Sequence, residues 1–524
     1  MSDAVRTFVA DDRAATEALF ASAADRFRAR RSAPARVETV YLDTFDGRLH
    51  CKGEALAWCR HGRGFELRWL DAADRTLRRV PMDRCPEYAA DLPALPGFDT
   101  VARRIDVRRL LPGVVLRSRR RVLRILDEAE KTVARVVFDH THASAPDKRD
   151  AHGLQPVLRV EPLRGFERAA EEVVAWLLAQ PGARELAGTE VERARAALPG
   201  SAPTPPDKLP APRTGDTARD ATRRILLHQL EVMLRNEPGV RENLDTEFLH
   251  DFRVAVRRTR AALGQLRGVF PREERSRFRK ELSWLGRMTG PVRDLDVYLT
   301  ILPRYRQWLP AAERQHLEPL RALLERRHTQ AHGELVRALD RKRYRRLVAS
   351  WREFLECPEA PALEAAPDAG RPISALAAER IHAMWEKALA RGGAIRHDTP
   401  ADGVHRLRID CKKLRYLLEF FGGLFPGADV RRAVRSLKKL QDNLGEFNDL
   451  VVQEGKLRQL VAGDDPGEGL PPQTLLAIGR LVERLDARRT AVRAQFHDRF
   501  EEFQRSDARA RLERWFGEPP PEAP

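Results

Sequence analysis

The sequence predicts an α+β domain followed by an all-α domain made of two related halves. Residues 1–198 mix short β-like runs with helical segments, whereas the chain from residue 217 onward has helical periodicity almost throughout. Within that helical part, a pattern of one His followed by cations occurs twice, starting at His250 and at His405, 155 residues apart. Residues 199–216, rich in Pro, Ala and Thr, predict an extended linker between the two domains.

The N-terminal domain shows several runs typical of strands and one clear helix. β-branched and apolar residues alternate with polar ones in these runs, as they do in half-buried strands. We expect strands at residues 5–9, 37–42, 65–70, 114–119, 133–138 and 157–160, and a helix at residues 167–178. Strand runs mixed with helices in this way indicate an α+β architecture.

The all-α domain, residues 217–516, is divided by a Pro/Ala-rich break at residues 357–372. This break separates repeat one, residues 217–356, from repeat two, residues 371–516. A loop at residues 463–472 joins two helices of the second repeat, and residues 517–524 form a Pro/Glu-rich tail. The repeat unit is much longer than a solenoid repeat, which favours two related helical bundles over an array.

Each copy of the repeated pattern places a row of positive charge on one helix face. A His at offset 0 is followed by cations at offsets 3, 7, 8 and 10, and offsets 0, 3, 7 and 10 fall within a stripe roughly 80° wide. We call these rows the first and second stripes. They consist of His250, Arg253, Arg257, Arg258 and Arg260, and of His405, Arg408, Lys412, Lys413 and Arg415.

The opposite faces of the same two helices are apolar, which predicts that they pack on a core. Phe252 and Val256 in the first copy, and Leu407 and Cys411 in the second, lie on the far side from the His. Phe270-Pro271 and Phe425-Pro426 are expected to end the two helices, because proline disfavours the helical conformation of the preceding residue.

The shared register continues downstream to Asp294 and Asp449, each 44 residues after its His. We hypothesise that these aspartates pair with stripe cations on the adjacent helix and fix their rotamers. A helix N-cap is the equally weighted alternative.

Composition limits the partners but does not choose among them. The formal net charge of +17 favours an anionic partner such as nucleic acid, an anionic membrane or polyphosphate. Five cysteines without zinc-ligand spacing predict free thiols in a reducing compartment. The sequence has neither a secretory signal at its start nor an apolar run long enough to cross a membrane, so we expect a cytoplasmic protein.

The helical domain resembles the CHAD family, the conserved histidine α-helical domain. The two stripes carry the resemblance, together with the downstream segments at residues 293–296 and 448–450 and the opening segment at residues 229–236. The resemblance implies two pseudo-symmetric four-helix bundles with a basic surface that binds inorganic polyphosphate. Cations in rows suit this ligand, since Arg offers forked donors to phosphate oxygens and Lys a point charge.

Residues 1–198 resemble a degenerate CYTH domain, a fold that implies an antiparallel β tunnel or barrel binding triphosphate and a divalent metal. The resemblance is carried by residues 40–44, 53–56, 117–121, 136–139 and 158–161. The acidic strand that opens active members is missing, because residues 5–9 contain no acid and the first glutamate is Glu17. Metal catalysis needs several convergent oxygen ligands, so we expect no metal, no cofactor and no enzymatic activity. The basic run 117–121 could retain phosphate affinity on those residues that face inward.

The function predicted from the sequence is therefore non-catalytic binding of inorganic polyphosphate, and targeting to polyphosphate granules is one compatible role. The alternative is a CYTH-type metal-dependent inorganic triphosphatase with an accessory CHAD domain. Nucleic-acid binding ranks below both, since the stripes carry neither the aromatics that stack on bases nor the amides that read them. A membrane-surface role is not expected, because the apolar face is needed for packing.

Overall fold

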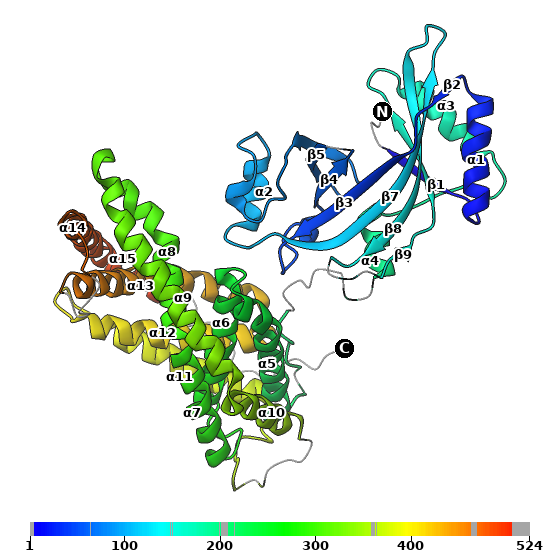
Figure 1. The fold of residues 1–524 in the computed structure, drawn as a ribbon. Helices are drawn as coiled ribbons and strands as arrows, with labels where there is room; N and C mark the ends of the chain where they lie inside the picture. The colour runs from blue at the N-terminus through cyan, green and yellow to red at the C-terminus, as the bar shows by residue number, and fades with distance from the viewer. Residues whose placement is uncertain are drawn as a thin grey trace. The chain divides into compact units, whose positions relative to one another are not determined.

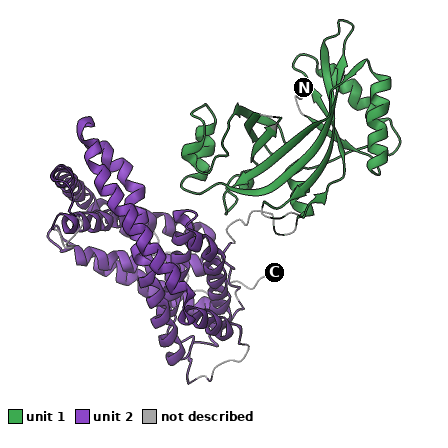
Figure 2. Cartoon of the chain, viewed as in Figure 1, with its two compact units in different colours: residues 1–207 green, residues 208–524 purple. Residues whose placement is uncertain are grey.

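The computed structural model describes residues 5–505 except 63, 147, 149, 199, 201–207, 214, 358–361, 363 and 463–468. The chain forms two compact units, residues 1–207 and 208–524, shown in different colours in Figure 2. The boundary between the units falls inside the predicted linker. The predicted tail, residues 517–524, and the predicted end of the second repeat lie outside the described residues.

Unit 1 is built on one antiparallel sheet with the strand order β11-β1-β10-β8-β7-β3-β4-β5-β6, with β2 pairing to β7 and β9 pairing to β8 (Figure 1). Two long strands, β7 and β8, run along its centre. The strands are β1 Arg6–Val9, β2 Ala29–Arg31, β3 Ala35–Asp43, β4 Ala55–His61, β5 Gly64–Leu70, β6 Thr76–Pro81, β7 Leu111–Leu126, β8 Thr132–Ser144, β9 His152–Gly153, β10 Val157–Pro162 and β11 Arg184–Glu185.

Each strand predicted from the sequence lies within, or overlaps, an observed strand, and the predicted helix at residues 167–178 is α3, Glu167–Leu178. Helices α1, Arg13–Arg26, and α3 pack on one face of the sheet over a core that includes Phe20, Phe138 and Leu177. Two shorter helices complete the unit, α2 Phe98–Ile105 and α4 Glu190–Ala197, with 3-10 turns at His50–Lys52 and Ala89–Asp91. The α+β prediction is confirmed.

Unit 2 is all-helical, and its two halves repeat the same helix order. The first half contains α5 Ala218–Glu242, α6 Thr246–Gln265, α7 Arg272–Met288, α8 Gly290–Trp308, α9 Glu318–Asp340 and α10 Lys342–Glu356, with a 3-10 segment at Ala311–Leu317. The second half contains α11 Ile373–Gly393, α12 Ala401–Phe421, α13 Gly427–Ala462, α14 Pro472–Ala494 and α15 Phe496–Arg505, with a 3-10 turn at Gly422–Leu424.

The spacing of 155 residues found in the stripes holds for the whole helical unit. Helices α5 and α11, α6 and α12, and α7 and α13 each start 155 residues apart, and α9 and α14 start within one residue of that spacing. If α7 and α8 are counted as one helix, equivalent to α13, each half has four long helices and a shorter fifth helix, α10 or α15. The prediction of four-helix bundles did not include this fifth helix. The duplication therefore extends from the motif to the fold.

The two halves differ in their third helix, which is continuous in α13 but broken between α7 and α8. Pro291 lies at the start of α8 and lacks the backbone N–H that a continuous helix would use, and Thr289 lies between the two helices. The prediction that Phe-Pro ends the motif helices is wrong in detail. Helix α6 already ends at Gln265 and α12 at Phe421, and the prolines instead precede α7 and α13.

The apolar faces predicted for the motif helices are buried, as expected. Phe252 and Leu407 have no exposed surface, and Val256 and Cys411 are buried. Aromatic clusters hold the fifth helices in place: Trp351 on α10 packs against Phe278 on α7, and Phe503 on α15 packs against Trp385 on α11. Burial of these faces leaves the stripes on the outer side of the packed helices.

Candidate functional site

The two stripes lie on neighbouring helices and meet across the contact between α6 and α12. Arg257 Nε donates a hydrogen bond to Tyr416 Oη at 2.7 Å. Arg258 Nη2 forms an ion pair with Glu419 Oε2 at 2.7 Å. Both contacts join a residue of the first stripe to α12, so the duplicated rows of charge form one surface.

Lys412 lies among arginines from both stripes. Burial, together with the neighbouring charges of Arg408 and Arg257, lowers its pKa to about 7 against the opposing effect of Asp449. Burial also lowers the pKa of Arg408, with Arg257 acting in the same direction. The Nε atom of Arg408 is buried without a hydrogen-bond partner. Like charges are thus held together in a partly desolvated place that an anion would stabilise.

A cleft of roughly 430 Å³ opens beside the second stripe. Arg408, Lys412 and Arg415 line one wall, and Tyr305 and Trp308 of α8 line another. Acidic residues of α13, including Asp442 and Glu446, also line it. The cleft is therefore basic on α12 and acidic on α13, while α8 contributes aromatics together with Arg304.

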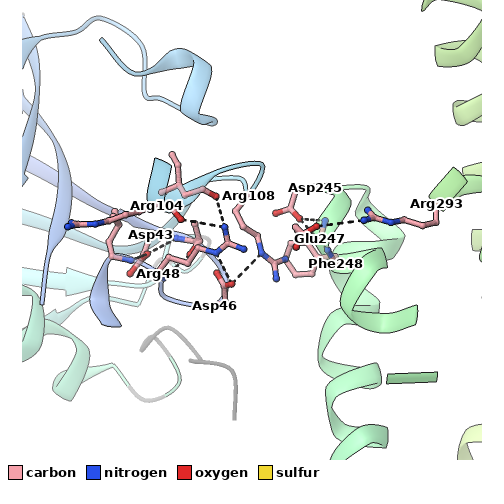
Figure 3. Close-up of polar contacts among 12 residues, drawn as sticks. Asp43, Asp46, Arg48, Arg104, Arg108, Asp245, Glu247, Phe248 and Arg293 are labelled. Carbon is pink, nitrogen blue, oxygen red and sulfur yellow. Dashed lines mark hydrogen bonds and ion pairs between the residues drawn. The ribbon is translucent and has the colours of Figure 1, made fainter. Parts of the chain in front are cut away.

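The stripe histidines are each oriented by a residue 43 positions later. His250 Nδ1 lies 2.9 Å from Arg293 Nη2. Arginine can only donate, so this Nδ1 accepts and the neutral ring carries its proton on Nε2. Arg293 also reaches the first turn of α6, bonding the carbonyl of Thr246 and lying 4.0 Å from Glu247 (Figure 3).

His405 is held in the opposite way. Its Nδ1 lies 2.6 Å from Oδ1 of Asn448, an amide oriented by the 3.5 Å contact between its Nδ2 and Asp449. His405 therefore donates through Nδ1, and it offers a second donor only when it is protonated. The two histidines match in register but differ in what their neutral rings present.

The two downstream aspartates lie inside helices α8 and α13, so neither is an N-cap and that alternative is wrong. Asp449 Oδ1 lies 3.6 Å from Arg408 Nη2 of the second stripe. Asp294 instead forms an ion pair with Lys456 of α13 at 2.6 Å, and it acts on Arg253 only through its charge. Of these two aspartates, only Asp449 forms an ion pair with a cation of the stripe in its own half.

Arg253 is tied to the break in the third helix. Its Nη1 donates to the carbonyl of Gly286 at 3.0 Å and to Thr289 Oγ1 at 2.6 Å. Its pKa is lowered by burial and by the charges of Arg257 and Arg293, although Asp294 opposes the shift. This stripe residue therefore satisfies acceptors where helical hydrogen bonding is interrupted.

The flanking cations predicted at offset 8 are already paired with acids. Arg258 is paired with Glu419, as described above. Lys413 lies 3.9 Å from the buried Asp410, which also pairs with Arg391. These two residues contribute to the charge of the surface but are partly neutralised, whereas Lys412 is held mainly among cations.

Unit 1 contains a second basic site, a cavity of roughly 1070 Å³ bordered by the sheet and α4. Nine arginines line it, among them Arg120, Arg124 and Arg159, against four acidic residues. Arg159 and Arg120 both pair with Asp139, whose carboxyl is fully buried. Burial opposes ionisation there, but the two arginines hold the pKa of Asp139 below its usual range.

Only part of the basic run 117–121 faces this cavity, as strand alternation requires. Arg120 lines the cavity. Arg117 lies 3.5 Å from Glu38, and Arg121 pairs with Glu17 of α1. The lining also includes Arg124, two strand periods beyond Arg120 along β7 and outside the predicted run.

The carboxylates of the cavity do not fit a divalent metal. Glu185 is paired with Arg6, Glu190 lies 3.5 Å from Arg159, and Glu161 lies 3.9 Å from Arg135. Burial raises the pKa of Asp74 to about 6, helped by the charge of Glu190. No group of three potential metal ligands occurs among the described residues. None of the described helices is long and apolar enough to span a bilayer.

Several site residues escaped the sequence analysis. Arg293 and Asn448 occupy equivalent positions beside the histidines, and their common spacing from the stripes was a usable signal. Tyr305, Trp308 and Tyr416 could not be found in this way, because they lack equivalents in the other half and meet the stripes only in the folded structure.

The geometry defines a class of protein: a duplicated helical domain that presents a continuous basic surface. Residues 224–458 match the CHAD domain family model. The crystal structure of the CHAD domain from the plant Ricinus communis is 30% identical, covering 55% of this chain and 95% of that chain, with a TM-score of 0.46. The chain belongs to the CHAD domain family.

Two further similar structures are PptA from Streptomyces chartreusis and a putative adenylyl cyclase from Hippeastrum described as having a dominant triphosphatase activity. PptA is 19% identical, covering 55% of this chain and all of its own, with a TM-score of 0.42. The Hippeastrum protein is 10% identical, covering 37% of this chain and 94% of its own, with a TM-score of 0.27. No curated protein sequence matches the chain.

Proposed function

We propose that unit 2 binds inorganic polyphosphate along the surface formed by the two stripes and does not transform it. The observation that carries this proposal is the convergence of Arg257, Arg408 and Lys412, three cations from two repeats held together in a partly buried place. Such an arrangement costs free energy in the empty protein and is relieved by a polyanion.

The shape of the surface favours a linear ligand without bases. The stripes run along two helix faces, each about 15 Å long, and offer donors in a row. Of the three aromatics beside the stripes, Tyr305 and Tyr416 are buried and Trp308 is half-buried, whereas single-strand binding usually interleaves accessible aromatics along the track. Association with polyphosphate granules is a cellular role compatible with this binding.

The test is titration of the full chain with long-chain polyphosphate and with duplex DNA at matched phosphate concentration and physiological salt. We expect tight binding to polyphosphate, weaker binding to DNA and an affinity that falls steeply with salt, because cation–phosphate contacts release counterions. A preference for DNA, or an affinity independent of salt, would contradict the proposal.

Charge reversal locates the site. The test variant replaces Arg253, Arg257, Arg408 and Lys412 with Glu and should abolish binding. The control variant makes the same change of charge at exposed cations on the first turns of α13: Arg431, Arg432, Arg435 and Lys438. Circular dichroism checks that both variants keep their helix content. An equal loss of affinity in both variants would mean that net charge, and not these four positions, determines binding.

A second candidate function concerns the arginine-lined cavity of unit 1, which supports binding of a small polyanion. Its carboxylates are paired with arginines, so this candidate involves no metal and no hydrolysis. The titration is repeated with tripolyphosphate and magnesium while free phosphate is measured. Release of phosphate would instead support the triphosphatase alternative.

A further inference from the structure

The two halves share their stripes but differ in the charge next to them. Comparison at the 155-residue spacing shows several arginines around α7 whose equivalents in the second half are not basic. Arg267, Arg275, Arg279 and Arg287 correspond to Gly422, Val430, Val434 and Asp442. We call the four arginines, which lie on α7 and the loop before it, the α7 cluster.

The α7 cluster is continuous with the first stripe through Arg260. The guanidinium of Arg260 lies over Gly286 of α7, where a Cβ would stand 3.3 Å from Nη1. Arg279 in turn lies over Gly264 of α6, and its Nη2 is 3.7 Å from the place that a Cβ on Gly264 would occupy. The missing side chains at these two glycines let the arginines cross between the helices, so the row of charge passes from α6 to α7.

Carboxylates do not neutralise these cations. Among the described residues, no ion pair involves Arg260 or any member of the α7 cluster, whereas the flanking stripe residues Arg258 and Lys413 are both paired. Two guanidinium nitrogens of Arg275, Nε and Nη1, are buried without a hydrogen-bond partner. The charges that most affect Arg275 are those of other arginines, Arg279 and Arg267. Uncompensated like charges in contact indicate a place for an anion.

The corresponding direction in the second half leads to acids. Asp442 and Glu446 line the cleft beside Lys412, and Asp442 occupies the position equivalent to Arg287. Beside the stripes, the second half thus places Asp442 where the first half places Arg287, although the first turns of α13 carry exposed cations of their own, Arg431, Arg432, Arg435 and Lys438. At this level of the two helices, a phosphate chain that continues from the stripes is attracted by Arg287 and repelled by Asp442.

We propose that the α7 cluster is a second phosphate-binding segment that continues the first stripe and makes the protein select long polyphosphate chains over short ones. This inference rests on the proposed function of the stripes. On unit 2, a short chain fills the stripes alone. A long chain also reaches Arg279, Arg287 and their neighbours along α7, from Arg275 to Arg287 a further 18 Å or so at the helical rise.

The test compares tripolyphosphate with long-chain polyphosphate on the full chain. Arg279→Glu together with Arg287→Glu reverses two exposed members of the cluster. The control, Arg435→Glu with Lys438→Glu, makes the same change of charge on the equivalent helix α13, at exposed positions outside the cleft. We expect the cluster variant to lose on the order of a hundredfold in affinity for the long chain, since hydrogen bonds to charged groups are the stronger ones. Its affinity for tripolyphosphate should change little.

A second readout is the salt dependence of long-chain binding, whose logarithmic slope should fall by roughly 0.7 for each lost contact. Equal losses for the short and long chains, unchanged long-chain affinity, or an equal effect of the control variant would overturn the proposal. If the wild-type protein binds no polyphosphate of any length, the proposed function of the stripes fails instead. The two failures are therefore distinguishable.

Discussion

Replacing Lys412 with methionine should make the free protein more stable and weaken its binding of polyphosphate. In the folded protein, burial and the charges of Arg408 and Arg257 lower the Lys412 pKa to about 7, from an ordinary value of 10.5. Since the unfolded chain keeps the ordinary pKa, folding at pH 7 costs on the order of 4 kcal/mol at this residue, at about 1.36 kcal/mol for each pH unit. Solvent screening reduces this upper limit.

Methionine keeps the length of the side chain but removes the ammonium. We expect a gain of roughly 1–3 kcal/mol in the free energy of unfolding, because the repulsion is lost and the apolar stem stays packed. Affinity for polyphosphate should fall about tenfold with the loss of one charged contact. The assay is urea unfolding followed by circular dichroism, paired with polyphosphate titration. Lower stability in the methionine variant would refute the reasoning.

Two further predictions concern protons and buried charge. Polyphosphate stabilises protonated Lys412, so its affinity should be highest below about pH 7 and should fall as the pH rises above that value. Calorimetry in two buffers should show proton uptake on binding in that range. The variant Lys412→Arg stays charged, so it should remove the part of the pH dependence that comes from Lys412. In unit 1, Asp139→Asn leaves Arg120 and Arg159 without their shared carboxylate. It should lower the free energy of unfolding by about 3–5 kcal/mol in urea melts. An unchanged free energy of unfolding in this variant would contradict the prediction.

The helical half was the more predictable part because its signals are long and local. Amphipathic periodicity located α6 and α12, and duplication fixed the register of helices that have weaker signals of their own. The predicted strands, such as β10, have a buried face, but a buried face was not sufficient, because β4 was missed although its Leu56 and Cys59 are buried. The strand β6 was missed because its sequence, TLRRVP, is mostly polar and half exposed at the edge of the sheet, which leaves no apolar alternation to detect.

The candidate site was predictable only where the halves agree. The stripes stand out because the two copies match there, whereas Arg279 and Arg287 correspond to Val434 and Asp442 and so give no match. The pairing of Arg258 with Glu419, and the wall formed by Trp308, depend on contacts between helices far apart in the chain. Such contacts leave no periodic trace in the sequence.

The break between α7 and α8 gives Arg253 contacts that differ from those of its equivalent in the second half, Arg408. In the first half, the side chain of Arg253 bridges the interruption by bonding the carbonyl of Gly286 and the hydroxyl of Thr289. A phosphate that drew Arg253 away would leave both acceptors without this donor. The second half has an uninterrupted α13 of 36 residues at the same place. Phosphate binding at Arg253 therefore competes with contacts across the helix break, whereas phosphate binding at Arg408 meets no such break.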